Sequence, residues 1–221
     1  MTGPAVTDES DVSVGDAIGW LHEEGLARLC ALSEASAPAA AFTVDVATGM
    51  VTAFPVTGAD SVARAADDLP PAADNPGRLV VVGLTSADAL LVVDLSGSLM
   101  MALNGDRPEL AARSWAAQLL LNPEISLTTN SSAVALDGSP RCRKSFIPGG
   151  GGDMISVDDG NPPVTTISMN SDMEGSDYLE RAPDGSGEMY LGPRYWQLRH
   201  VMTIADGPWS ALAATLDEAG K

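Results

Sequence analysis

The stretch from residue 79 to residue 135 constrains the fold more than any other part of the chain. Two short apolar, β-branched runs, 79–84 and 89–95, flank Thr85-Ser86-Ala87-Asp88, whose side chains suit a tight reversal. These runs predict a β-hairpin. A third apolar run, 98–103, ends at Asn104-Gly105-Asp106 and predicts another strand.

A helix is expected after this third run and extends to about residue 120. Asp106 can cap its N-terminus, and Pro108 suits the first turn, where its missing N–H has no intrahelical partner. Asn122-Pro123 ends the helix, and 125–129 read as a strand. Apolar residues recur at helical spacing on one broad face: Leu110, Ala112, Trp115, Ala116, Leu119 and Leu120. The order strand, helix, strand predicts a central βαβ unit.

The N-terminal sequence predicts elements that lie beside this unit. Apolar residues between 14 and 33 fit an amphipathic helix, in which Gly25 is a weak point. The runs 41–46 and 50–55 flank Ala47-Thr48-Gly49 and predict a second hairpin. Residues 60–69 predict a short helix.

The region from 145 to 187 has a different composition, rich in Gly, Pro, Asp and Ser, with one apolar strand at 164–169. We expect long, mobile surface loops there, because such a chain buries too little apolar surface to offset its ordering entropy. Residues 189–191 and 195–199 predict paired strands, and a final helix should follow around Leu212.

Together these patterns predict an α/β or α+β fold with a small mixed sheet, a central βαβ unit, an N-terminal helix and hairpin, and a C-terminal helix. The expected division of the chain is a flexible N-terminus at 1–13 and an α/β core at 14–144. Next we expect an acidic, glycine-rich loop region at 145–187. Strands and a helix at 188–221 should then complete the core.

The charge balance limits the partners of the chain. Thirty acidic residues against twelve basic ones give a formal charge of −18. Such a surface repels phosphate backbones and anionic lipid, so we expect neither nucleic acid nor membrane as a partner. Another protein is the partner that remains.

The cysteines and the N-terminus bear on the compartment. Cys30 and Cys142 could form one disulfide or remain two free thiols in a reducing cytosol, and we favour the thiols. No basic segment with an apolar run follows Met1, and no apolar run reaches the ~20 residues of a transmembrane helix. We therefore expect a cytoplasmic protein.

The first candidate site is Asp94-Leu95-Ser96-Gly97-Ser98, at the carboxyl end of an expected strand. This spacing resembles the start of the metal-ion-dependent adhesion site of von Willebrand A-type domains, and implies that Asp94, Ser96 and Ser98 hold Mg²⁺. The later Thr and Asp ligands of that family have no counterpart here. The alternative is a Ser/Gly turn between two strands, and we expect no bound metal or other cofactor.

The second candidate is the loop Gly105-Asp106-Arg107, between a strand and a helix. Helix N-termini bind phosphates with their free amides, so residual nucleotide binding is an alternative function. The loop has no Gly-Lys-Ser/Thr, however, and Asp106 places a negative charge where phosphate oxygens would lie. We expect no catalysis.

The third candidate is the only concentrated positive charge, formed by Arg141, Arg143 and Lys144 around Cys142. It can dock an acidic segment of a partner protein. The alternative is a run of charge that keeps a surface loop solvated.

The order of the elements resembles a domain of large actinobacterial proteins that also carry LysM and bacterial transcriptional activator domains. The resemblance lies in the apolar runs 79–84, 90–95 and 99–106, the helix through Leu120, and the ending from 188. In that family the glycine-containing turn is similar to a degenerate nucleotide loop of FtsK-like and type VII secretion ATPases. The resemblance transfers no site residue, and it implies a non-catalytic interaction or regulatory module.

Overall fold

The computed structural model describes residues 12–58, 60–147, 152–170 and 177–219. Its strands are β1 (Ala39–Asp45), β2 (Met50–Pro55), β3 (Val62–Ala65), β4 (Leu79–Thr85), β5 (Ala89–Asp94), β6 (Met100–Gly105), β7 (Ser126–Thr129), β8 (Cys142–Lys144), β9 (Asp153–Asp158), β10 (Thr165–Met169), β11 (Asp177–Arg181), β12 (Gly187–Leu191) and β13 (Arg194–Val201). They form one 13-stranded sheet in the order β3-β2-β1-β5-β4-β13-β12-β11-β6-β10-β9-β7-β8, which is mostly antiparallel. The predicted mixed α/β class is confirmed, but the prediction of a small sheet is wrong.

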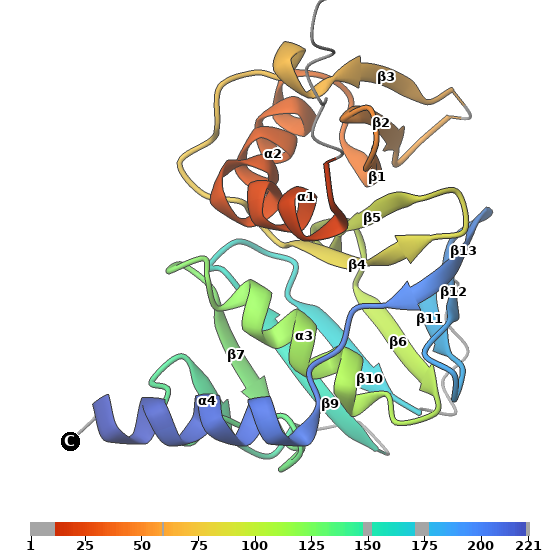
Figure 1. Ribbon diagram of the computed structural model, residues 1–221. Helices are drawn as coiled ribbons and strands as arrows, with labels where there is room; N and C mark the ends of the chain where they lie inside the picture. The colour runs from red at the N-terminus through yellow and green to blue at the C-terminus, as the bar shows by residue number, and fades with distance from the viewer. Residues whose placement is uncertain (1–11, 59, 148–151, 171–176, 220–221) are drawn as a thin grey trace, which may run out of the picture.

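The helices are few and lie in two groups (Figure 1). Figure 1 shows α1 and α2 beside the strands of the N-terminal half, and α3 and α4 in the other half, near β7 and β9. The helical segments are α1 (Val14–Trp20), the π-helical turn η1 (Leu21–Gly25), α2 (Leu26–Ala35), the 3₁₀ turns η2 (Ala66–Asp68) and η3 (Leu95–Gly97), α3 (Glu109–Leu119) and α4 (Asp206–Ala219).

Two hydrophobic cores lie on opposite faces of β4 and β5. Val81 and Val92 belong to the core that α1 and α2 cover. Val80 and Val93 belong to the core that contains α3 and most of the later strands. Burial on both faces explains why these two strands are continuous apolar runs rather than alternating ones. The predicted hairpin of β4 and β5 is confirmed.

The predicted N-terminal helix and hairpin are confirmed. Ser13 and Asp16 form a capping box at the start of α1. At the expected weak point the helix widens into η1, and a Cβ at Gly25 would lie 2.9 Å from the Trp20 ring. The glycine therefore allows the tryptophan to pack on the helix backbone. β1 and β2 pair as an antiparallel hairpin.

The prediction of a helix at 60–69 is wrong. Residues 62–65 form β3, which pairs antiparallel with 50–53 of β2, and only 66–68 make a short 3₁₀ turn. The free edge of β2 provides ladder hydrogen bonds that a four-residue segment cannot form alone. This tertiary pairing overrides a weak local helical preference.

The predicted central βαβ unit is not formed by neighbouring strands. The helix α3 lies between β6 and β7 in the chain, as expected, but β10 and β9 separate these two strands in the sheet. β6 pairs instead in parallel with β10 and β11. These inserted strands come from later sequence, so the run 98–135 could not reveal them.

The Gln118 side chain anchors α3 to β4. Its Oε1 accepts from the Val81 N–H at 2.8 Å, and its Nε2 donates to the Val81 carbonyl at 3.0 Å. β13 pairs with β4 at Gly83, Leu84 and Thr85. The Gln118 side-chain amide therefore makes the hydrogen bonds with the Val81 N–H and carbonyl that a neighbouring strand would otherwise make.

The strand predicted at 164–169 is confirmed as β10, but the loop prediction for the rest of 145–187 is wrong for two segments, which form β9 and β11 inside the sheet. Ile155, Val157, Ile167 and Leu179 are at most 1% exposed and belong to the larger core. β9 and β11 are short and alternate apolar with polar residues, so the surrounding Gly and Asp residues hid their pattern. The parts of this prediction at 148–151 and 171–176, and most of the expected flexible N-terminus, lie outside the described residues.

The predicted C-terminal strands and helix are confirmed. β12 and β13 pair antiparallel, which places Tyr190 opposite Tyr195. In α4, Trp209 is 5% exposed and fixes the helix to the larger core. Arg113 of α3 binds Asp206 at the start of α4 at 2.6 Å.

Candidate functional site

Asp94, Ser96 and Ser98 lie in the turn between β5 and β6. The Asp94 Oδ1 accepts from the Ser96 N–H at 2.9 Å and from the Ser96 hydroxyl at 2.6 Å. The Ser98 hydroxyl donates to Asp177 at 2.5 Å. The bonds between Asp94 and Ser96 are typical of a Ser/Gly turn, the alternative interpretation of this motif, and the Ser98 bond ties the turn to β11.

A small cavity of about 140 Å³ lies beside this turn, lined in part by Asp94, Ser98, Asp177 and Arg194. The Arg194 guanidinium donates to the Gly58 carbonyl at 2.9 Å and brings a positive charge to the cavity. Among the described residues, no group of three or more His, Cys, Asp and Glu side chains could share a metal ion. The arrangement offers Mg²⁺ few oxygen ligands.

The loop of Gly105, Asp106 and Arg107 does connect β6 to α3, as the sequence predicted. Two of its three amides already have acceptors, because the Gly105 N–H donates to Asn170 at 3.0 Å and the Asp106 N–H donates to the Arg181 carbonyl at 2.9 Å. A Cβ at Gly105, whose φ is +90°, would lie 2.1 Å from that carbonyl. Only glycine fits this contact, so the glycine serves packing here.

Arg107 is also engaged within the protein. Its guanidinium binds Glu109 at 3.0 Å and Asp206 at 2.9 Å. Hydrogen bonds from Arg113 and Arg107 hold the pKa of the Asp206 carboxyl below its usual range. Two carboxylates therefore lie near the N-terminus of α3, where a nucleotide phosphate would have to compete with them.

We expect neither Mg²⁺ nor ATP to change the melting temperature of the protein. A ligand that binds the native state at a hundredfold excess over its dissociation constant would add about 2.7 kcal/mol of stability. Thermal denaturation with each ligand tests this. A saturable rise of the melting temperature with Mg²⁺ that Asp94→Ala abolishes would support the metal site. A rise with ATP that Arg107→Ala abolishes would support the nucleotide site.

The predicted basic patch is divided by the structure. Arg141 lies half-buried and donates to the carbonyls of Leu120, Asn122 and Ile125, at 2.6 to 3.1 Å. It therefore caps the chain after α3 instead of facing a partner. Arg143 and Lys144 are exposed on β8, at the end of the sheet.

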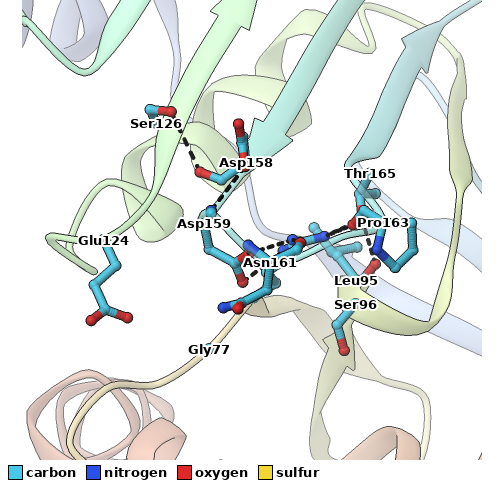
Figure 2. Close-up of polar contacts among 12 residues, drawn as sticks. Gly77, Leu95, Ser96, Glu124, Ser126, Asp158, Asp159, Asn161, Pro163 and Thr165 are labelled. Carbon is cyan, nitrogen blue, oxygen red and sulfur yellow. Dashed lines mark hydrogen bonds and ion pairs between the residues drawn. The ribbon is translucent and has the colours of Figure 1, made fainter.

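Among the described residues, the most buried cation is Arg78, which is 3% exposed and was not a candidate from the sequence. It binds both carboxylate oxygens of Asp159 and donates to the Asn161 carbonyl, the Pro163 carbonyl and the Thr165 hydroxyl. Figure 2 shows these partners converging from the turn between β9 and β10. All five N–H donors of the guanidinium are used, so this cluster stabilises the fold and leaves no donor for a ligand.

A different surface presents recognition chemistry, on the outer side of β11, β12 and β13. Two rows of side chains cross these strands, and we call them the tyrosine–glutamate face. The strand register aligns the members of each row: Tyr178, Tyr190 and Tyr195 in one row, and Glu180, Glu188 and Gln197 in the other. The alternate residues, such as Leu179, Met189 and Leu198, are buried on the inner side.

The three tyrosine rings contact one another along their row. Tyr178 and Tyr190 stack with centroids 4.5 Å apart, and the Tyr190 and Tyr195 centroids are 5.0 Å apart. Tyr195 is 47% exposed, although it is a large aromatic residue. The row forms a rigid amphipathic ridge on the surface.

Glu188 is held in place by two of these tyrosines. The Tyr190 hydroxyl donates to one of its oxygens at 2.9 Å, and the Tyr195 hydroxyl donates to the other at 3.3 Å. The hydrogen bond to Glu188 raises the pKa of Tyr190 to about 12. The two hydroxyls therefore donate to the carboxylate and keep it oriented.

Part of this face could have been found in the sequence. The strands expected at 189–191 and 195–199 place Tyr190 and Tyr195 on the same side once Gly192-Pro193 is recognised as their turn. Tyr178 and Glu180 could not be found, because their strand lay in the region interpreted as loop.

No protein-family model, curated protein or solved structure matches this chain. The resemblance to the domain of actinobacterial LysM and activator proteins therefore stays a prediction. Within the described ranges, no helix has the length and apolar character needed to cross a membrane.

Proposed function

We propose that the protein is a non-catalytic interaction module that binds another protein through the tyrosine–glutamate face. The observation that supports this is the ordered row of three tyrosines, with Tyr195 47% exposed. Tyrosine is enriched in protein interfaces, because it buries a large ring at low entropic cost and keeps a polar hydroxyl.

The chemistry of the other candidates gives them less support. The backbone amides at Gly105 and Asp106 have acceptors within the protein, and the hydroxyls of Ser96 and Ser98 bind carboxylates. The proposal includes a cytoplasmic location, which the free thiols of Cys30 and Cys142 support.

The test is affinity capture from the source cells with the wild type and the Tyr195→Ser variant as baits. We expect the variant to lose at least one captured protein, whose affinity should fall about tenfold when it is purified and titrated. The matched control is Phe146→Ser, because Phe146 is 82% exposed and follows β8, far along the sheet from β13.

Phe146→Ser should capture the same proteins as the wild type. If Tyr195→Ser also captures an unchanged set, while circular dichroism shows that both variants are folded, the tyrosine–glutamate face is not the binding surface.

A further inference from the structure

The second row of the tyrosine–glutamate face places two negative charges side by side. Glu180 and Glu188 are direct cross-strand partners on β11 and β12, and Gln197 continues the row on β13. Like charges directly opposite each other destabilise a strand pair. Glu180 is exposed, and within the described part of the chain its carboxylate has no hydrogen bond or ion pair.

A shallow hollow of about 450 Å³ lies beside this row. Asp106, Glu180, Glu188 and Gln197 line it together with Arg181. The Arg181 side chain is only 11% exposed and is paired with Asp106 at 3.0 Å. The charge that remains accessible in the hollow is therefore negative.

The one exposed cation farther along β13 is also neutralised. The Arg199 guanidinium forms an ion pair with Asp88, at 2.5 Å. Neither arginine therefore supplies an unpaired positive charge to Glu180 or Glu188.

From this arrangement we infer that the partner contributes an arginine-bearing segment, whose guanidinium binds between Glu180 and Glu188 and stacks on the tyrosine row. This inference rests on the proposed function and specifies the chemistry of its partner. A planar guanidinium donates to two carboxylate oxygens at once and stacks on aromatic rings, which an ammonium does less well. The formal charge of −18 also steers a basic segment toward this protein.

The experiment uses the full chain and a defined probe, the acetylated and amidated peptide Gly-Arg-Arg-Arg-Gly, in calorimetric titrations at low and physiological salt. The same peptide with citrulline in place of arginine keeps the shape and removes the charge. We expect the arginine peptide to bind and the citrulline peptide not to bind.

Three variants locate the binding. Glu180→Gln and Glu188→Gln should each weaken the arginine peptide about threefold to tenfold, as expected when one carboxylate loses its ion pair. Asp68→Asn is the matched control, because Asp68 is exposed beside the edge strand β3, separated from β12 by β2, β1, β5, β4 and β13, and the substitution removes the same charge. It should change the affinity less than about twofold.

Equal weakening by Asp68→Asn would overturn the inference, since the peptide would then respond only to the total charge. Failure of the arginine peptide to bind would also overturn it. If Tyr195→Ser still loses its captured protein in that case, the proposed function stands with a partner of different chemistry. The arginine peptide could instead bind while Tyr195→Ser captures the same proteins as the wild type. That result would contradict the proposal that the tyrosine–glutamate face binds a protein partner.

Discussion

Replacing Trp115 with alanine should lower the free energy of unfolding by about 3–5 kcal/mol. Trp115 is 0% exposed, and it lies on α3 at the centre of the larger core. Removal of the ring loses its transfer free energy and leaves a cavity between the helix and the sheet. Urea denaturation followed by far-ultraviolet circular dichroism measures the change without depending on tryptophan fluorescence.

The control for this substitution is Trp20→Ala. Trp20 is only half-buried, and its ring packs along its own helix against Gly25. It should cost clearly less than Trp115→Ala. An unchanged denaturation midpoint for Trp115→Ala would show that α3 does not carry the core.

The second large effect is expected for Arg78→Met, at about 3–5 kcal/mol of lost stability. Methionine fills a similar volume but removes the guanidinium that donates to the Asp159 carboxylate and to the carbonyls of Asn161 and Pro163. The matched control is Arg64→Met on the edge strand β3, where the arginine is exposed and the expected change is within about 0.5 kcal/mol. Equal effects of the two substitutions would contradict the structural role of Arg78.

The Arg78 cluster also predicts how the stability difference between the wild type and Arg78→Met depends on pH. Burial alone would raise the pKa of Asp159, but hydrogen bonds from Arg78 and from the Asn161 N–H outweigh burial and lower the pKa below its usual range. The stability that the carboxylate supplies is therefore complete above the unfolded pKa of about 3.9. It is lost as the pH falls through the lower folded value.

In Arg78→Met, the pKa of Asp159 should instead rise, because burial remains and the guanidinium is gone. The stability difference between the wild type and the variant should therefore shrink from pH 7 to about pH 3. Urea midpoints at both pH values check this. A difference that grows toward acid would show that the ion pair is not the source of the effect.

The candidate residues show how local sequence signals mislead about function. Arg141 belonged to the only basic run in the chain, yet its guanidinium binds carbonyls at the end of α3. Gly105 belonged to a loop in the position of a phosphate site, yet its missing side chain makes room for the Arg181 carbonyl. In both cases the partner atoms lie at least sixteen residues away in the chain, so no local pattern contains them.

The sequence by itself determined the elements whose stability is local or whose burial is complete. The strands at 79–85 and 89–94, the helix at 109–119 and the hairpin at 39–55 follow from apolar periodicity and turn residues, which act over a few positions. Tertiary structure alone decided that β10 and β9 separate β6 from β7, and that three tyrosines share one row. The physical reason is that backbone hydrogen bonds between strands carry no side-chain identity, so a strand's neighbours are chosen by the packing of the whole sheet.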